Sequence, residues 1–340
     1  MSKSEAPPQP PPSPDEIKSK LERALFEMKR VIVGQDPMLE RVFVSLLSGG
    51  HLLLEGVPGL AKTLTIRTLA QVLGGSFARI QFTPDLVPSD LVGTRIYNPH
   101  STQFDVELGP VFCNFLLADE INRAPAKVQS ALLEVMQEQQ VTIGHHTYQV
   151  ESPFLVMATQ NPIESEGTYP LPEAQVDRFM MKVVVGYPAF GEEMEVVHRS
   201  LDDPVVVNEV ITTEEVLAFQ RVAESIYVDR PISEYAVALT LATREPGRFG
   251  RQDLHQYINY GASPRGSINL VHGAQALALM RGRRYVLPQD VREIAKDVLR
   301  HRMVLSYDAL AEEVTPDRIL DDLVAAVPSP HIELANQQTA

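Results

Sequence analysis

The stretch that decides the fold of this chain reads Gly56-Val57-Pro58-Gly59-Leu60-Ala61-Lys62-Thr63. An apolar run of strand length, His51–Leu54, leads into it, and a segment with helical spacing, Lys62–Leu73, follows it. A strand, a glycine turn and a helix cradle phosphate, because glycines let backbone N–H groups point inward and the helix N-terminus adds positive potential. We therefore expect Lys62 to reach the β and γ phosphates of a nucleotide and the Thr63 hydroxyl to bind Mg²⁺.

One residue departs from the strict form of this motif. The residue before the lysine is normally glycine, and here it is Ala61. A methyl group is tolerated at that position if the residue already belongs to the helix. Taken alone, the loop could be a chance glycine turn, so the nucleotide interpretation depends on the rest of the chain.

A second strand pattern ends in two neighbouring acids. The buried run Asn114–Ala118 is followed directly by Asp119 and Glu120. Because the carboxyl ends of parallel strands face the ligand crevice, Asp119 can hold Mg²⁺ there, and Glu120 can orient and polarise an attacking water. A third strand runs toward Asn161, whose amide could hold that water or sense the γ-phosphate.

Apolar strands alternate with helical stretches from residue 50 to about 186. The expected strands are His51–Leu54, Ala78–Phe82, Phe115–Ala118, Phe154–Ala158 and Lys182–Val185, and the expected helices are Lys62–Leu73 and Ala126–Gln137. Their continuous apolar character predicts an α/β core, a parallel five-stranded sheet with helices on both faces. Residues 94–106 and 141–150 alternate around turn residues and predict two β-hairpin inserts.

The ends of the chain differ from this core. Residues 1–14 are rich in proline and predict a disordered tail, which could be passive or a docking peptide. A capping box at Ser13-Pro14-Asp15-Glu16 predicts the first helix, and the core domain should span 15–204. Helical stretches near 213–226, 232–244, 264–280, 288–302 and 316–327, with no strands, predict an all-α domain over 205–330 and a flexible tail over 331–340.

Composition excludes several classes of protein. The net charge of −14 disfavours a general nucleic-acid-binding protein, which normally shows a basic excess. The single cysteine, Cys113, excludes an internal disulfide and a cysteine zinc site, and we expect it to be a buried apolar thiol. No apolar run reaches the roughly 18–20 residues of a membrane helix, and no signal peptide is visible. By elimination we expect a cytoplasmic protein without membrane insertion.

These motifs, in this order, resemble those of an AAA+ ATPase, and their wording resembles the MoxR family more closely still. The matching stretches are Gly56–Thr63, Asp119-Glu120-Ile121-Asn122-Arg123-Ala124, Ala158-Thr159-Gln160-Asn161-Pro162 and Leu171-Pro172-Glu173-Ala174-Gln175-Val176-Asp177-Arg178-Phe179. Alanine before the lysine is usual in that family. The resemblance spans roughly residues 20–330 and implies a P-loop AAA+ core with a helical lid.

The resemblance also implies roles for individual residues. Asn161 matches sensor 1, Arg178 matches the arginine finger that reaches a neighbouring subunit's nucleotide, and Arg265 matches sensor 2 on the lid. Arg123 could also point across the subunit boundary. The implied ATP/ADP-binding residues are Val33, Gly34, Gln35, Gly56, Val57, Pro58, Gly59, Leu60, Ala61, Lys62, Thr63 and Leu64, with Thr63 and Asp119 for Mg²⁺. Family members form hexameric rings and act as chaperone-like maturation factors, often with a von Willebrand A-type partner.

Other readings of the same architecture stay open. A nucleic-acid motor or loader would need Lys or Arg clusters on the hairpins, yet residues 94–106 offer Arg95 only and residues 141–150 offer none. A magnesium-chelatase-type motor subunit would carry both inserts, and a small-molecule P-loop kinase is a weaker alternative. The sequence leaves open the client and whether assembly depends on nucleotide.

Overall fold

The computed structural model describes residues 12–331, except Pro58, Ser101, residues 162–166, Asp202 and Pro204. Pro58 of the predicted phosphate loop and most of the two predicted tails therefore lie outside the described residues. The predicted capping box is present, since Ser13 and Glu16 exchange hydrogen bonds at the start of α1 (Pro14–Lys29). The described residues thus begin inside the span predicted as the N-terminal tail.

The centre of the molecule is a five-stranded parallel sheet, and the predicted fold class is confirmed. Its strands, in spatial order, are β2 (Phe77–Gln81), β5 (Phe115–Asp119), β8 (Leu155–Gln160), β1 (Leu52–Glu55) and β9 (Met181–Val184). Each begins or ends within two residues of the prediction. All five carboxyl ends therefore lie along one edge of the sheet.

The three central strands, β5, β8 and β1, bury side chains on both faces of the sheet, whereas the edge strands β2 and β9 leave Arg79, Gln81 and Val184 exposed. Leu52 and Leu54 of β1 belong to one apolar cluster, whereas Leu53 belongs to the other. The first cluster includes residues of α1, α2 (Asp36–Leu47) and α3 (Lys62–Val72), and the second includes residues of α5 (Ala126–Glu138). Strands buried on both faces need apolar residues at every position, which is why the sequence shows continuous rather than alternating runs.

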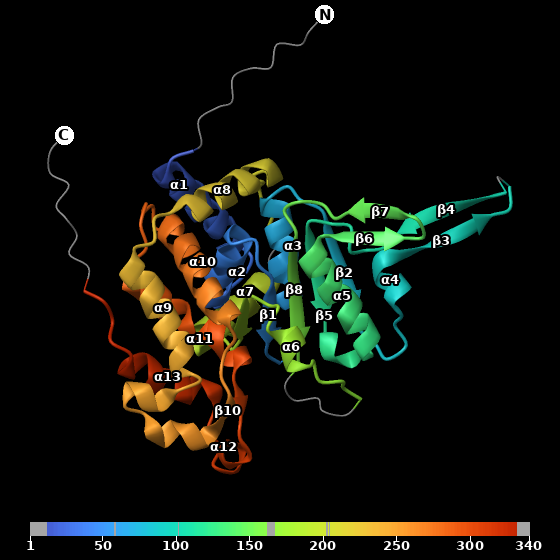
Figure 1. The fold of residues 1–340 in the computed structure, drawn as a ribbon. Coiled ribbons are helices and arrows are strands. Elements are labelled where there is room, and N and C mark those ends of the chain that lie inside the picture. The colour runs from blue at the N-terminus through green and yellow to red at the C-terminus, as the bar shows by residue number, and fades with distance from the viewer. Residues whose placement is uncertain are drawn as a thin grey trace, which may run out of the picture.

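Two hairpins extend from the core on the side away from the C-terminal helices (Figure 1). The first pairs β3 (Gly93–Asn98) with β4 (Gln103–Leu108), and the second pairs β6 (Gln140–Ile143) with β7 (His146–Gln149). The β3–β4 hairpin reaches furthest from the body (Figure 1). Its Tyr97 and Phe104 rings lie 5.3 Å apart, and the Arg95 guanidinium lies 4.7 Å from the Phe104 ring.

The C-terminal part is helical, as predicted, and packs against the first two helices. Its longer helices are α8 (Thr213–Ser225), α9 (Arg230–Ala242), α10 (Pro264–Met280), α11 (Pro288–Leu299) and α13 (Pro316–Ala326), with the short α12 (Tyr307–Ala311). The same apolar cluster contains residues of α10, α1 and α2, so the lid shares a core with the N-terminal helices.

One expectation about the lid was wrong. β10 (Ile258–Tyr260) and β11 (Val304–Leu305) form a short antiparallel pair, although no strand was predicted after residue 205. Strands of two and three residues carry no usable hydrophobic period, so the sequence could not reveal them.

The remaining elements connect these parts. They are α4 (Pro88–Val92), α6 (Glu173–Val176) and α7 (Phe190–Leu201), with 3₁₀ turns that include η1 (Ile121–Arg123) and η4 (Arg300–Arg302). Cys113 is buried, as expected, and burial raises its pKa to about 12. Across the described ranges, no helix is both long and apolar enough to cross a membrane.

Candidate functional site

The glycine loop turns from β1 into α3 as the sequence predicts. A side chain at Gly56 would meet the Val185 carbonyl oxygen at 2.7 Å, and Gly59 has a left-handed φ of +87°. Both positions therefore require glycine. Ala61 is not part of the helix: it is the residue before α3, with φ 56° and ψ 15°. The condition under which its methyl group would be tolerated is not met, so the loop holds an alanine in a conformation that disfavours side chains.

A pocket of about 470 Å³ lies at the carboxyl edge of the sheet. Its lining residues are Gly59, Leu60, Ala61, Lys62, Thr63, Leu64, Arg79, Gln81, Asp119, Glu120, Thr159 and Asn161. The structure thus brings the glycine loop, both acids and the predicted sensor amide together in one place, although they come from the ends of three different strands, β1, β5 and β8. Hydroxyl and carboxylate oxygens are the ligands that Mg²⁺ prefers, and Thr63 and Asp119 supply them.

Lys62 already points into this loop. Its ammonium group donates a hydrogen bond to the Gly56 carbonyl oxygen. Burial lowers the pKa of Lys62, and the nearby carboxylates of Asp119 and Glu120 oppose that shift. A partly buried cation beside glycine N–H groups fits the phosphates of a nucleotide.

Asp119 is held by two donors. The Thr159 hydroxyl donates to Asp119 Oδ1 at 2.6 Å, and Arg79 Nη2 donates to Oδ2 at 2.7 Å. Thr159 Oγ1 also accepts the N–H of Glu120 at 2.8 Å. One β8 side chain therefore fixes both acids at the end of β5.

The Glu120 carboxylate is contacted by Gln81, which the sequence analysis did not select, and by Arg123, which was considered for a role across the subunit boundary and here pairs within its own chain. Gln81 Nε2 donates to Glu120 Oε2 at 3.0 Å, and Arg123 Nη1 lies 3.1 Å from the same oxygen. Gln81 Oε1 in turn accepts from Arg79 at 2.8 Å. Because Arg79 and Gln81 stand at the carboxyl end of β2, a neighbour of β5, their position could have been predicted from the strand order alone.

A larger cavity, about 1010 Å³, adjoins the phosphate pocket and shares Gly59, Leu60, Ala61 and Leu64 with it. Val33 and Gln35, which the resemblance assigns to adenine binding, line this cavity. Gln35 Nε2 donates to the Gly186 carbonyl at 3.2 Å, which ties this segment to the end of β9. Gly34 adopts a left-handed φ of +70° between them.

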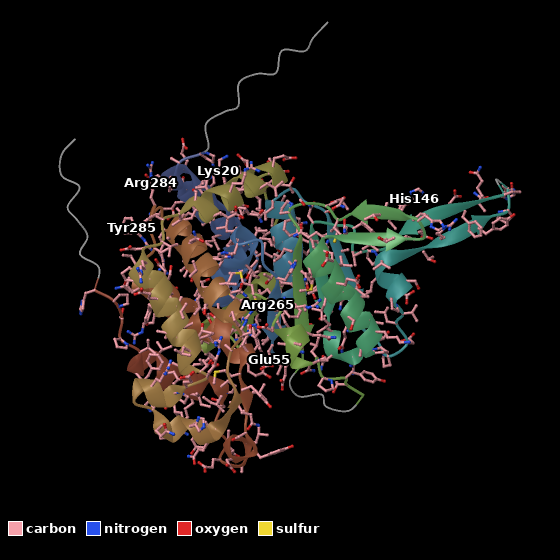
Figure 2. All side chains as sticks on the ribbon, viewed as in Figure 1. Lys20, Glu55, His146, Arg265, Arg284 and Tyr285 are labelled. Carbon is pink, nitrogen blue, oxygen red and sulfur yellow. The ribbon has the colours of Figure 1, made fainter. Side chains whose placement is uncertain are left out.

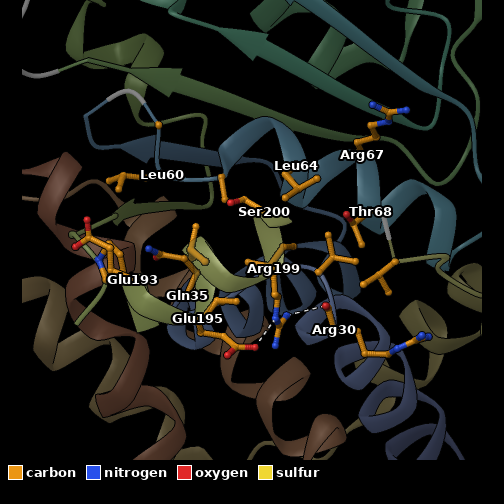
Figure 3. A pocket seen from close by; sticks show the side chains of 18 of the residues that line it. Arg30, Gln35, Leu60, Leu64, Arg67, Thr68, Glu193, Glu195, Arg199 and Ser200 are labelled. Carbon is orange, nitrogen blue, oxygen red and sulfur yellow. Dashed lines mark hydrogen bonds and ion pairs between the residues drawn. The ribbon is translucent and has the colours of Figure 1, made fainter. Parts of the chain in front are cut away.

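Helix α7 forms a wall of this larger cavity and was not predicted (Figure 3). Arg199 donates to the carbonyls of Lys29 and Arg30, at 3.0 and 2.6 Å, and pairs with Glu195 at 2.7 Å. Arg199 therefore ties α7 to the end of α1. These carbonyls lie at the end of α1, just before the segment that contains Val33 and Gln35.

Arg178 and Arg265 lie elsewhere. They line a third pocket, about 430 Å³, that shares no lining residue with the phosphate pocket. Figure 2 labels Arg265 between the lid helices and the sheet. Arg178 lies just before β9. Two residues later, the Met180 N–H donates to the His51 carbonyl at 2.8 Å, so this segment lies beside the start of β1. At about 3.3 Å per strand residue, the amino edge that carries Arg178 lies on the order of 20 Å from the glycine loop.

Comparison with known proteins decides the family. Residues 51–181 match the model of the ATPase family associated with various cellular activities (AAA), and residues 251–323 match an AAA lid domain. A protein named chaperone MoxR1, from Mycobacterium tuberculosis, is 56% identical over 94% of this chain and 84% of its own length. The chain belongs to the MoxR family of AAA+ ATPases.

Further relatives match nearly the whole chain. YeaC of Bacillus subtilis is 45% identical over 91% of this chain and 95% of its own, and protein MoxR of Paracoccus denitrificans is 33% identical over 88% and 93%. A crystal structure of a candidate ATPase from Cytophaga hutchinsonii superposes with a TM-score of 0.88 at 48% identity, covering 94% of this chain and 97% of that one. This chain and the Cytophaga hutchinsonii protein therefore share the P-loop nucleotide-binding fold.

Proposed function

We propose that this MoxR-family chain hydrolyses ATP with Mg²⁺ as a cytoplasmic, head-to-tail hexameric ring of identical subunits, and that it remodels another protein. The observation that carries the proposal is the division of its functional residues between two edges of one sheet. Lys62, Asp119 and Glu120 gather at the carboxyl edge, whereas Arg178 and Arg265 face a pocket at the amino edge.

Within the carboxyl-edge pocket, each residue suits one task. Lys62 exchanges its bond with the Gly56 carbonyl for the phosphates, and the Thr63 hydroxyl and Asp119 hold Mg²⁺, which neutralises phosphate charge when bound. Glu120 accepts a proton from, and orients, the attacking water, and Asn161 donates to that water or to the γ-phosphate. The adenine base occupies the adjoining cavity beside Val33, Gly34 and Gln35, with Val57 and Leu64 near the sugar and phosphates.

The two arginines act on a neighbour's nucleotide. Neither can finish the site of its own chain, because the sheet separates the two pockets. In a heterologous ring, the amino-edge surface of one subunit meets the carboxyl-edge surface of the next. A finger arginine that stabilises transition-state charge in this way contributes about 10³–10⁵ in rate. Hydrolysis should therefore require assembly.

The protein-remodelling role rests on relatives and on exposed hairpin surface. The Mycobacterium tuberculosis relative is named a chaperone. In the β3–β4 hairpin, Ile96, Tyr97 and Phe104 are all exposed large apolar side chains. Its one arginine lies over the Phe104 ring rather than in a basic cluster, which favours a protein client, such as a von Willebrand A-type partner, over nucleic acid.

The test replaces the arginines one at a time. Arg178→Ala and Arg265→Ala should bind ATP with wild-type affinity and lose hydrolysis, Arg178→Ala by about 10³-fold or more. Arg230→Ala is the matched control, because that arginine has a side chain 87% exposed on α9 and lines neither pocket. If Arg178→Ala hydrolyses ATP at the wild-type rate, the shared-site proposal is wrong.

A further inference from the structure

Arg302 occupies an unusual place behind the finger arginine. It ends η4, directly after α11 of the lid, and its side chain is fully buried. Its Nη2 donates to the Asp177 carbonyl at 3.0 Å and to the Phe179 carbonyl at 2.6 Å. These are the two carbonyls on either side of Arg178, so one lid nitrogen holds the backbone from which the finger projects.

The other nitrogens of Arg302 bind further atoms of the same segment and a carbonyl of α11. Nη1 donates to the Met180 carbonyl at 3.2 Å and to the Val298 carbonyl, and Nε donates to Asp177 Oδ1 at 2.9 Å. A planar guanidinium with five donors can satisfy such a set, and a lysine ammonium cannot. Burial lowers the pKa of Arg302 to about 10, and the Asp177 carboxylate opposes that shift.

Asp177 joins Arg302 to the second arginine. Its carboxylate accepts from Ser263 Oγ, at 2.9 and 3.0 Å, and lies 3.6 Å from Arg265 Nη1. Ser263 caps α10, and its Oγ accepts the N–H of Arg265 at 3.2 Å. The Asp177 carboxylate therefore contacts the start of α10, the lid helix that carries Arg265. The Asp177 backbone lies between α6 and Arg178.

We propose that Asp177 and Arg302 are positioning residues that fix Arg178 and Arg265 relative to each other, so that the lid sets the geometry presented to the neighbouring subunit. This inference rests on the proposed function, in which both arginines act across the interface. Neither Asp177 nor Arg302 lines the chain's own phosphate pocket. Loss of the contact between Asp177 and Arg302 should therefore misplace the two arginines that a subunit presents to its neighbour and leave its own nucleotide site intact.

Subunit mixing separates these two effects. Asp177→Asn keeps the size of the side chain and removes its charge. Alone, it should bind ATP and assemble normally, with an unchanged KM and a kcat lower by about 100-fold, the order expected when a catalytic group is misplaced by about 1 Å. Glu120→Gln should also be inactive alone, but it keeps both arginines correctly placed.

Mixed in equal amounts, the two inactive variants should recover hydrolysis. In a head-to-tail ring, about a quarter of the interfaces then pair an intact site of the Asp177→Asn subunit with intact arginines of the Glu120→Gln subunit, so about a quarter of the wild-type rate is expected. Asp322→Asn is the matched control: it breaks the 2.9 Å pair with Arg251 in the lid and should keep full activity unmixed.

A parallel mixture of Arg178→Ala with Glu120→Gln distinguishes failure of the shared-site proposal from failure of the positioning role. If that mixture stays inactive, the shared-site proposal fails. If it recovers activity but the Asp177→Asn mixture does not, or if Asp177→Asn alone has the wild-type rate, the positioning role is wrong. Should Asp177→Asn not fold, Ser263→Ala removes the hydroxyl that joins Asp177 to the Arg265 N–H, and the same complementation is required of it.

Discussion

His51 should make the stability of this chain depend on pH in a defined window. The imidazole is fully buried between β1, α5 and β8. Its Nδ1 accepts the Val156 N–H at 3.1 Å, so Nε2 carries the proton and donates to the Met136 carbonyl at 3.1 Å. A second proton would have to sit on Nδ1, facing a backbone N–H. Burial accordingly lowers the pKa of His51 to about 4 from 6.5.

The sign follows from which state binds the proton. Between these two pKa values the unfolded chain protonates His51 and the native chain does not, so stability is lost as pH falls through about 6.5 toward 4. From about pH 8 to about pH 5, the loss attributable to His51 is roughly 2 kcal/mol, at 1.36 kcal/mol per pKa unit. The buried His301, whose pKa is also lowered by burial, adds to the loss in the same direction.

Urea denaturation at both pH values measures this effect. Circular dichroism is the suitable signal, because the chain has no tryptophan. His51→Gln keeps one donor and one acceptor but does not titrate. It should be less stable than wild type at about pH 8, yet lose roughly 2 kcal/mol less on going to about pH 5. Since His301 is present in both proteins, its contribution cancels. Equal losses in the two proteins would refute the reasoning.

Three further predictions concern the nucleotide pocket. Lys62→Ala should weaken ATP binding by about 10- to 100-fold, the range of a charge-assisted hydrogen bond, and calorimetry that finds unchanged affinity would contradict the assigned role. Gln81→Ala removes the donor at 3.0 Å from Glu120 and should lower kcat by about tenfold or more while ATP affinity stays constant; equal kcat would show that this contact does not orient the carboxylate. Ala61→Gly should relieve the left-handed conformation and raise stability by up to about 1 kcal/mol, so a lower melting temperature would contradict the strain argument.

The sequence was informative wherever structure is dictated locally. All five strands were located to within two residues, and the three central ones show continuous apolar runs because they are buried on both faces. The glycine loop and the two acids follow directly after strands, and parallel strands bring their carboxyl ends together. The capping box at Ser13 also located the start of α1.

Contacts that depend on tertiary packing could not be predicted from the sequence. Arg178 and Arg265 are 87 positions apart along the numbering, and nothing local shows that one carboxylate joins them on the sheet edge opposite the phosphate pocket. Arg302 sits in a run of charged residues that reads as solvated surface, yet its side chain is fully buried. Helix α7 was missed because its large apolar side chains, such as Phe190 at 82% exposure, are not buried against the core.

The central claim is that each active site is divided between two subunits. The most direct test is the ATP hydrolysis rate per subunit, measured across a dilution series together with the mass of the particle by light scattering. The account predicts a specific rate that rises with concentration and levels off once assembly is complete. A dilute monomer that hydrolyses ATP as fast as the assembled form would contradict it.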